Sequence, residues 1–118
     1  MAIVRSLATA GALMALALLS GCAAPQKPLY YWGAYQAQVY GYFTGTKGVE
    51  EQILALEEDR QKARAEGLPH PPGYHAFLGI LHGVNGRADL QVQGFETEKA
   101  QFPESTAYIE FLLKNARK

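Results

Sequence analysis

Cysteine is almost absent from this 118-residue sequence, which contains only Cys22. A single cysteine excludes an intramolecular disulfide, and it also excludes a zinc site built from several thiolates. The folded part of the chain must therefore be held together by packing and hydrogen bonds.

Runs of basic residues are also missing. Eleven Lys and Arg balance eleven Asp and Glu, so the formal net charge is 0. Binding to nucleic acid, and an electrostatic hold on anionic lipid, both depend on clustered positive charge. The sequence therefore argues against nucleic acid as a partner.

Patterns typical of catalysis or metal binding are scarce. His75 and His82 lie about 10.5 Å apart along a helix at ~1.5 Å per residue, whereas zinc needs its ligands ~2 Å away. His70 lies in a proline-rich segment and could join them only by folding back. Ser105 is better explained as a helix cap than as a nucleophile. We predict no catalytic residue, no metal site and no cofactor, and we expect the carboxylates to lie on polar faces.

One apolar run is present, from Leu7 to Leu19, with Arg5 before it and small residues after it. As a helix the run would be about 20 Å long, too short for a hydrocarbon core of ~30 Å. A basic start, a short apolar run and a small-residue cleavage region are typical of an export signal. Residues 1–21 are therefore predicted to be a signal peptide.

The residues at the end of this signal, Leu19-Ser20-Gly21-Cys22, resemble the lipobox of bacterial lipoproteins. The resemblance implies that Cys22 becomes the first mature residue and carries a thioether-linked lipid, so that the protein is held on a membrane by acyl chains. An ordinary secreted protein with an incidental cysteine is the alternative. Ala23, where an aspartate would favour inner-membrane retention, implies the outer membrane and its periplasmic face.

The mature chain divides into a tether at residues 22–28, which holds two prolines, and a predicted helical domain at residues 29–118. Strand signals are weak, whereas apolar residues recur at helical spacing. The predicted helices after the aromatic start of the domain are Thr46–Glu66, Tyr74–His82, Arg87–Gln101 and Glu104–Ala116. We predict an all-α fold of two antiparallel helical hairpins and a C-terminal capping helix, with charged residues 57–60 on a solvated face.

The second hairpin resembles a tetratricopeptide unit. Counted from Pro72, Leu78-Gly79 falls at the Leu-Gly pair of that repeat, and Phe95 and Pro103 follow at its spacings. The glycine would let two helices approach, the aromatic ring would fill the space between them, and the proline would end the second helix. A generic helical hairpin with the same spacing by coincidence is the alternative. When the tetratricopeptide pattern is moved back by 34 residues, the first hairpin does not match it.

The domain begins with LYYWGAYQAQVYGYF, residues 29–43, which contains seven aromatic side chains. On a helix, Trp32, Tyr35, Val39 and Tyr42 would share one face, and Gly33 and Gly41 would let the next helix approach. Packing in the interior is one interpretation, and contact with the bilayer interface is another. The third is a partner-binding surface, since exposed Tyr and Trp are enriched in interfaces. The candidate residues for it are Tyr30, Tyr31, Trp32, Tyr35 and Tyr40.

The lipobox, the short tether and YYWGAYQAQVYGYF together resemble a small family of proteobacterial lipoproteins of unknown function. The resemblance implies a role in envelope assembly or secretion, with a curli-secretion-channel-like lipoprotein as a candidate partner. It supplies no catalytic residues. The sequence thus predicts a non-enzymatic, outer-membrane scaffolding lipoprotein. A small-ligand or cell-wall glycan binder or enzyme, and a purely structural envelope lipoprotein, are the alternatives.

Overall fold

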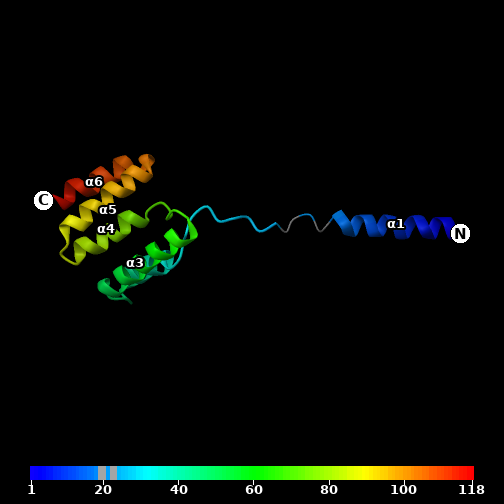
Figure 1. Ribbon diagram of the computed structural model, residues 1–118, viewed down its shortest axis with the longest axis horizontal. Helices are drawn as coiled ribbons and strands as arrows, with labels where there is room; N and C mark the ends of the chain where they lie inside the picture. The colour runs from blue at the N-terminus through cyan, green and yellow to red at the C-terminus, as the bar shows by residue number, and fades with distance from the viewer. Residues whose placement is uncertain (19–20, 22–23) are drawn as a thin grey trace.

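The computed structural model describes residues 1–18, 21 and 24–118, and every regular element in this part of the chain is helical. The all-α prediction is confirmed. The elements are α1 (Ala2–Leu18), α2 (Tyr35–Thr44), α3 (Val49–Glu66), α4 (Tyr74–Val84), α5 (Ala88–Gln101), the 3₁₀ helix η1 (Pro103–Ser105) and α6 (Thr106–Ala116). Figure 1 shows α1 apart from the other helices, and residues 24–28, which form no regular element, lead into the domain. No helix in the described ranges has both the length and the apolarity needed to cross a membrane.

Leu19, Ser20, Cys22 and Ala23 lie outside the described residues, so the lipidation prediction at Cys22 is not addressed by the structure.

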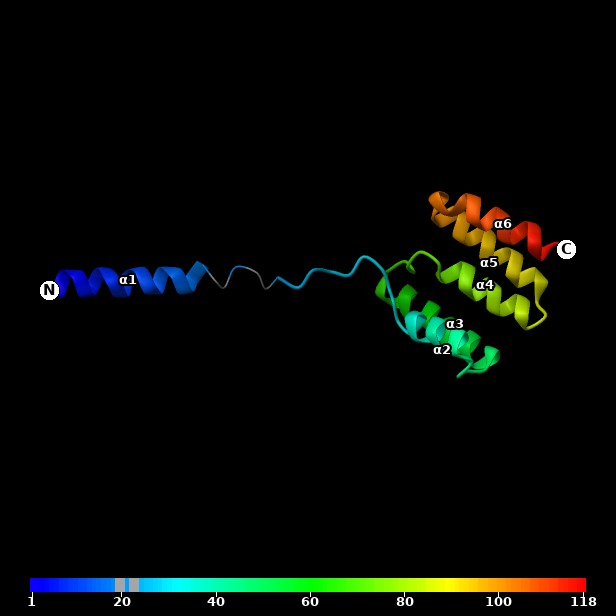
Figure 2. The same ribbon diagram turned by 180° about the vertical axis from the view of Figure 1, so that it is seen from behind.

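Helix α4 is the centre of the domain, and seven of its eleven residues are buried. On one side, Tyr74, Phe77, Leu78 and Leu81 of α4 form a core with Leu56 of α3. On the other side, Ala76 of α4 packs with Phe95 of α5 and with Ile109 and Leu113 of α6. Figures 1 and 2 show the result, a layer of α4, α5 and α6 with the α2–α3 hairpin beside α4.

The α4–α5 contact has the construction predicted from its spacing. A Cβ atom on Gly79 would lie 3.0 Å from the Gln91 carbonyl oxygen and 3.2 Å from the Phe95 ring, so any other residue would force the α5 backbone or this buried ring to shift. Phe95 is 1% exposed and fills the space between the helices. Helix α5 ends at Gln101, and Pro103 begins η1. The glycine, aromatic and proline positions therefore have the predicted roles.

The helix predicted across the aromatic stretch is shorter than expected. Helix α2 begins at Tyr35, and Trp32 precedes it. Gly33 has φ +45°, a left-handed conformation that turns the chain before the helix starts. The N–H of Tyr31 donates to the Pro69 carbonyl at 2.8 Å, which ties the entering chain to the α3–α4 loop. Trp32 therefore does not share the face of Tyr35, Val39 and Tyr42 in the way that one continuous helix would require.

Candidate partner-binding face and interhelical cleft

The aromatic side chains of residues 29–43 divide into an inner and an outer set. Tyr35, Val39 and Tyr42 pack against the core that α4 shares with α3. The Tyr35 ring lies 5.8 Å from that of Tyr74, and Tyr42 lies 5.7 Å from Phe77. Tyr40 and Phe43, on the outer side of α2, are 70% and 80% exposed. The interior interpretation thus holds for part of the stretch only.

The outer set lies along a shallow apolar groove on α2, and Tyr35 and Val39 of the inner set also line this groove. Its volume is about 490 Å³, and its lining residues are Trp32, Tyr35, Gln36, Val39, Tyr40 and Phe43. None of these side chains carries a formal charge. Trp32 remains 45% exposed and stacks on Tyr35, with ring centroids 6.3 Å apart. The groove therefore presents aromatic surface to solvent in a form that an apolar partner segment could cover.

The structure separates the five predicted partner-binding residues. Trp32, Tyr35 and Tyr40 line the groove, whereas Tyr30 packs edge-on against Phe102, with centroids 6.2 Å apart. Tyr31 is half-buried, with its ring 6.3 Å from the His70 ring. Phe43 belongs to the groove although it was not among the predicted residues. Its spacing of three from Tyr40 was the available signal, because residues at i and i+3 share a helix face.

Helix α2 is fixed to α3 by buried polar groups. The Asp59 carboxylate accepts a hydrogen bond from the Ala34 N–H at 2.6 Å, just before α2 begins. Asp59 is 4% exposed, so the prediction that residues 57–60 form a solvated face is wrong at this position. The carboxylate meets an N–H that lacks a helical partner, and this compensates for its burial. A side chain on Gly33 would collide with it, so the predicted close approach at Gly33 is confirmed.

Two glutamines complete this contact. Gln52 is fully buried, and its Nε2 donates to the Gln38 carbonyl oxygen of α2 at 2.6 Å. Gly41 is also buried, but a Cβ on it would meet only the flexible side chain of Lys47, at 3.0 Å. The predicted close approach of α3 therefore does not explain why glycine stands at position 41. The first hairpin is held by polar contacts to the backbone.

The second hairpin contains a matching carboxylate. Glu98 of α5 is 2% exposed and accepts from the N–H groups of Gly73, His75 and Ala76, at 2.6, 3.1 and 3.2 Å. These are free N–H groups at the start of α4, where an anion is favoured by the helix dipole. The expectation that all carboxylates lie on polar faces is therefore wrong for Glu98 as well. Asp59 and Glu98 are 39 residues apart, as are the buried Leu56 and Phe95, so the hairpins repeat at 39 residues and not at 34.

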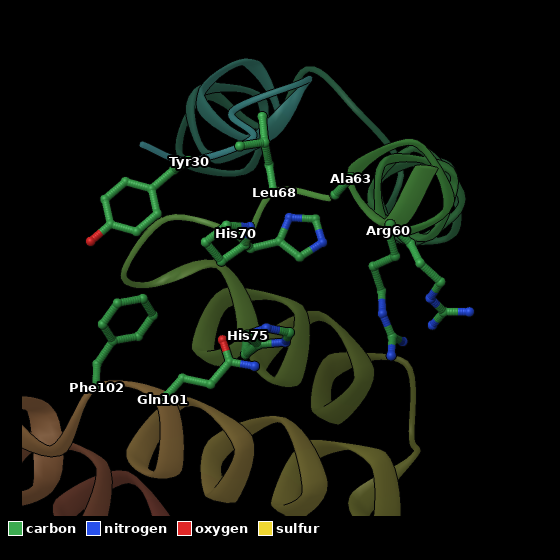
Figure 3. Close-up of a pocket in the computed structure, with 10 residues that line it drawn as sticks. Tyr30, Arg60, Ala63, Leu68, His70, His75, Gln101 and Phe102 are labelled. Atoms are coloured by element: carbon green, nitrogen blue, oxygen red, sulfur yellow. The ribbon is translucent and has the colours of Figure 1, made fainter. Parts of the chain in front are cut away.

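A second cavity, of about 510 Å³, lies between the α3–α4 loop, α3 and the end of α5. Figure 3 shows Tyr30 and Phe102 on one side and Arg60 on the other, with His70, His75 and Gln101 between them. His70 does fold back from its proline-rich loop. Its ring stacks on Tyr74 at 3.7 Å and lies edge-on to His75 at 5.6 Å.

The surroundings of both histidines favour the neutral imidazole. Burial, followed by the neighbouring His75 and Arg60, lowers the pKa of His70 to about 4. Burial and Arg60 also lower the pKa of His75. A neutral imidazole has one donor and one acceptor nitrogen. No cluster of three or more His, Cys, Asp or Glu suited to a metal ion occurs among the described residues.

Comparison with known proteins places the chain in a family. Residues 29–112 match the Domain of unknown function (DUF4810). The chain belongs to this family. The matched region runs from the first aromatic residues to α6, so it includes both the groove and the cleft. Neither a curated protein nor a solved structure matches the chain.

Proposed function

We propose that this DUF4810 protein is a non-enzymatic lipoprotein, anchored in the outer membrane through Cys22, that holds another envelope protein through the groove on α2. The anchor is supported by the sequence from Arg5 to Cys22, which has the three parts of an export signal and ends in a lipobox-like tetrapeptide. Acyl chains on Cys22 would hold the domain at the membrane without a transmembrane helix.

The exposed aromatic groove is the observation that carries the binding proposal. Tyr40, Phe43 and Trp32 present large apolar area, and aromatic residues dominate the energetics of protein interfaces. The inner side of α2 is fixed to the core through Tyr35 and to α3 through Asp59 and Gln52. The outer aromatic residues are therefore displayed on a rigid support, so a partner would not have to order them.

The position of the groove favours a protein over the bilayer as its occupant. Helix α2 runs away from the point where the tether joins the domain (Figure 2). Its ten residues span about 15 Å at ~1.5 Å per residue, so the groove extends away from the tether, from Tyr35 at the near end of α2 past Tyr40 to Phe43 at the far end. Because the groove has no charged lining, the partner segment should be apolar. The resemblance to proteobacterial lipoproteins makes a curli-secretion-channel-like lipoprotein the first candidate.

The chain offers a matched control for testing this surface. Tyr40 and Phe43 are three residues apart on α2, and Tyr108 and Phe111 are three apart on α6, with 59% and 61% exposure. The lipidated protein would be purified from its own envelope with each pair changed to Ala, and associated proteins would be quantified by mass spectrometry. The proposal predicts that Y40A/F43A loses a partner that Y108A/F111A retains. Equal recovery by both variants, with unchanged circular dichroism, would contradict it.

The anchor is tested separately. Mass spectrometry of the native N-terminal peptide should find Cys22 as the first residue, modified by acyl chains. The Cys22→Ala variant should leave the membrane fraction or keep its leader. An unmodified Cys22 behind an intact leader would refute the anchor while leaving the groove proposal open to its own test.

A further inference from the structure

The cleft of Figure 3 shares no lining residue with the groove on α2, so a function assigned to it is independent of partner binding there. Its lining comes from five places in the chain: Tyr30 before α2, the last turns of α3, the α3–α4 loop, His75 near the start of α4, and the end of α5 with Phe102 after it. These segments meet at the end of the domain where the tether enters (Figure 2). A ligand in the cleft would therefore lie on the side of the domain that faces the tether.

Positive charge is concentrated in this cleft without a basic run in the sequence. Arg60 and Arg64 both line it, and their spacing of four residues places them on one face of α3. Its lining includes no Asp or Glu. Arg60 is held by Glu57, with Nη1 3.0 Å from Oε2, whereas Arg64 has no ion pair within the described part of the chain. Guanidinium groups favour phosphate and carboxylate, which they can bind through two parallel hydrogen bonds.

One buried polar atom without a hydrogen-bond partner lies beside these cations. The His70 side chain is 8% exposed, and its Nδ1 is buried with no hydrogen-bond partner. A buried polar atom of this kind calls for an explanation, such as a bound ion or ligand. His75 and Gln101 also line the cleft, and the Tyr30 and Phe102 rings close its other side. The cleft thus combines cations, neutral donors and an aromatic wall.

We propose that this cleft binds a phosphate group, with Arg64 and Arg60 facing its oxygens, His70 as a neutral hydrogen-bond partner, and Tyr30 and Phe102 against the attached organic group. A phosphate ester carries up to two negative charges and several acceptor oxygens, which suits two adjacent guanidinium groups better than a single carboxylate does. The phosphate could belong to a lipid headgroup or to a soluble molecule. Only the lipid source depends on the membrane placement proposed above.

The purified full chain in a non-ionic detergent would be titrated by calorimetry with phenyl phosphate, benzoate, benzyl alcohol and short-chain phosphatidylglycerol below its micellar concentration. Phenyl phosphate should bind, benzoate should bind more weakly, and benzyl alcohol should not bind. Stronger binding of phosphatidylglycerol than of phenyl phosphate would assign the site to a lipid headgroup, and the reverse order to a soluble phosphate. Equal affinity for phenyl phosphate and benzyl alcohol would overturn the proposal.

Arg64→Gln is the decisive variant, because Arg64 is exposed and its loss should leave the fold intact. Removing a hydrogen-bonding cation from a bound anion should weaken phosphate binding by about tenfold or more. Arg117→Gln, which removes an exposed arginine outside the cleft, should leave the affinity unchanged. Equal loss in both variants would show that only overall charge matters, and no loss in Arg64→Gln would refute the site. A shift of the His70 ring-nitrogen resonances on adding phenyl phosphate is expected, and resonances that do not move would remove His70 from it.

Discussion

The α2–α3 and α4–α5 hairpins bury a carboxylate in the same way but differ in what surrounds it. In each, the second helix sends an acidic side chain back to free N–H groups at the start of the first, from Asp59 to Ala34 and from Glu98 to Gly73, His75 and Ala76. The α4–α5 pair adds a tight contact at Gly79 and Phe95 and is covered by α6. Among the described residues, no further helix covers the outer side of the α2–α3 pair, where Tyr40 and Phe43 remain exposed.

We infer from this difference that the second hairpin mainly stabilises the fold, whereas the first hairpin mainly exposes aromatic side chains to a partner. The second hairpin supplies the central helix, which contributes to both cores, so its carboxylate should matter most for folding. The first hairpin uses its carboxylate to set the position of α2, and it leaves an aromatic face free. Four predictions test this division, and they are ordered from the largest expected effect to the smallest.

Glu98→Ala should be the most damaging change. It removes the acceptor of three N–H groups at the start of the central helix, and it leaves a cavity beside them. We expect the free energy of unfolding to fall by about 3 kcal/mol or more, because unsatisfied buried donors cost ~1–3 kcal/mol each and the penalties partly overlap. Urea denaturation followed by circular dichroism measures this. Glu98→Gln, which keeps an acceptor oxygen, should lose less, and equal losses would show that hydrogen bonding is not the cause.

Acidification should destabilise the domain through its buried histidines. The pKa of His70 is about 4 in the folded protein and 6.5 in the unfolded chain, so between these values the unfolded state binds more protons. Stability should therefore be full above about pH 7 and decline as the pH falls toward 4. At ~1.4 kcal/mol per pKa unit the His70 part is on the order of 3 kcal/mol. His75 acts in the same direction.

His70→Phe isolates the histidine contribution. Phenylalanine keeps a ring on Tyr74 but does not titrate, so the pH dependence of its melting temperature between pH 6.5 and 4 should be flatter than that of the unmodified protein. His75, Arg60 and Asp59, which face His70, remain in place in the variant. Identical slopes for the two proteins would contradict the assignment to His70.

Asp59→Ala should cost about 2 kcal/mol of unfolding free energy, since one buried N–H loses its acceptor. Glu58→Ala, the adjacent change, removes an exposed carboxylate paired with Lys62 and should leave stability unchanged. Thermal unfolding of both variants compares them directly. Similar small effects at the two positions would instead support the prediction that residues 57–60 lie on a solvated face. Asp59→Ala should also loosen α2 and so weaken partner binding.

The smallest effect is expected at Gly41. The atoms nearest to a methyl group there are Cδ, Cγ and Cβ of the flexible Lys47 side chain, at 3.0 to 3.4 Å, so once that side chain shifts slightly Gly41→Ala should stabilise α2 by roughly 0.5 kcal/mol through helix propensity. The same change at Gly94 would place its Cβ 2.7 Å from the His75 carbonyl oxygen, and it should destabilise the protein. Opposite signs in thermal melts support the contrast between the hairpins. Destabilisation at both sites would mean that the first hairpin is packed as tightly as the second.

Much of this fold could be predicted from the sequence where a pattern is local. The roles of Gly79, Phe95 and Pro103 depend on nearby residues, and the structure confirms them. The helix bounds differ by a few residues, as at α3, which begins at Val49 and not at Thr46.

The buried polar contacts could not be predicted in the same way. Asp59 stands in a run of four charged residues, and its burial depends on a backbone N–H 25 residues earlier in the chain. Glu98 likewise depends on the loop that begins α4. The cleft gathers Tyr30, Arg64, His70 and Gln101 from four segments, and no single stretch of sequence shows their proximity. The place of Phe43 in the groove, by contrast, could have been predicted from its helical spacing to Tyr40.

Photo-crosslinking in intact cells tests most directly the claim that α2 holds a partner. A photoreactive amino acid at position 40 should give a discrete crosslinked protein, whereas the same group at position 108 should not give that product. Absence of any adduct from position 40, or the same adducts from both positions, would contradict the claim that the aromatic groove is the binding surface.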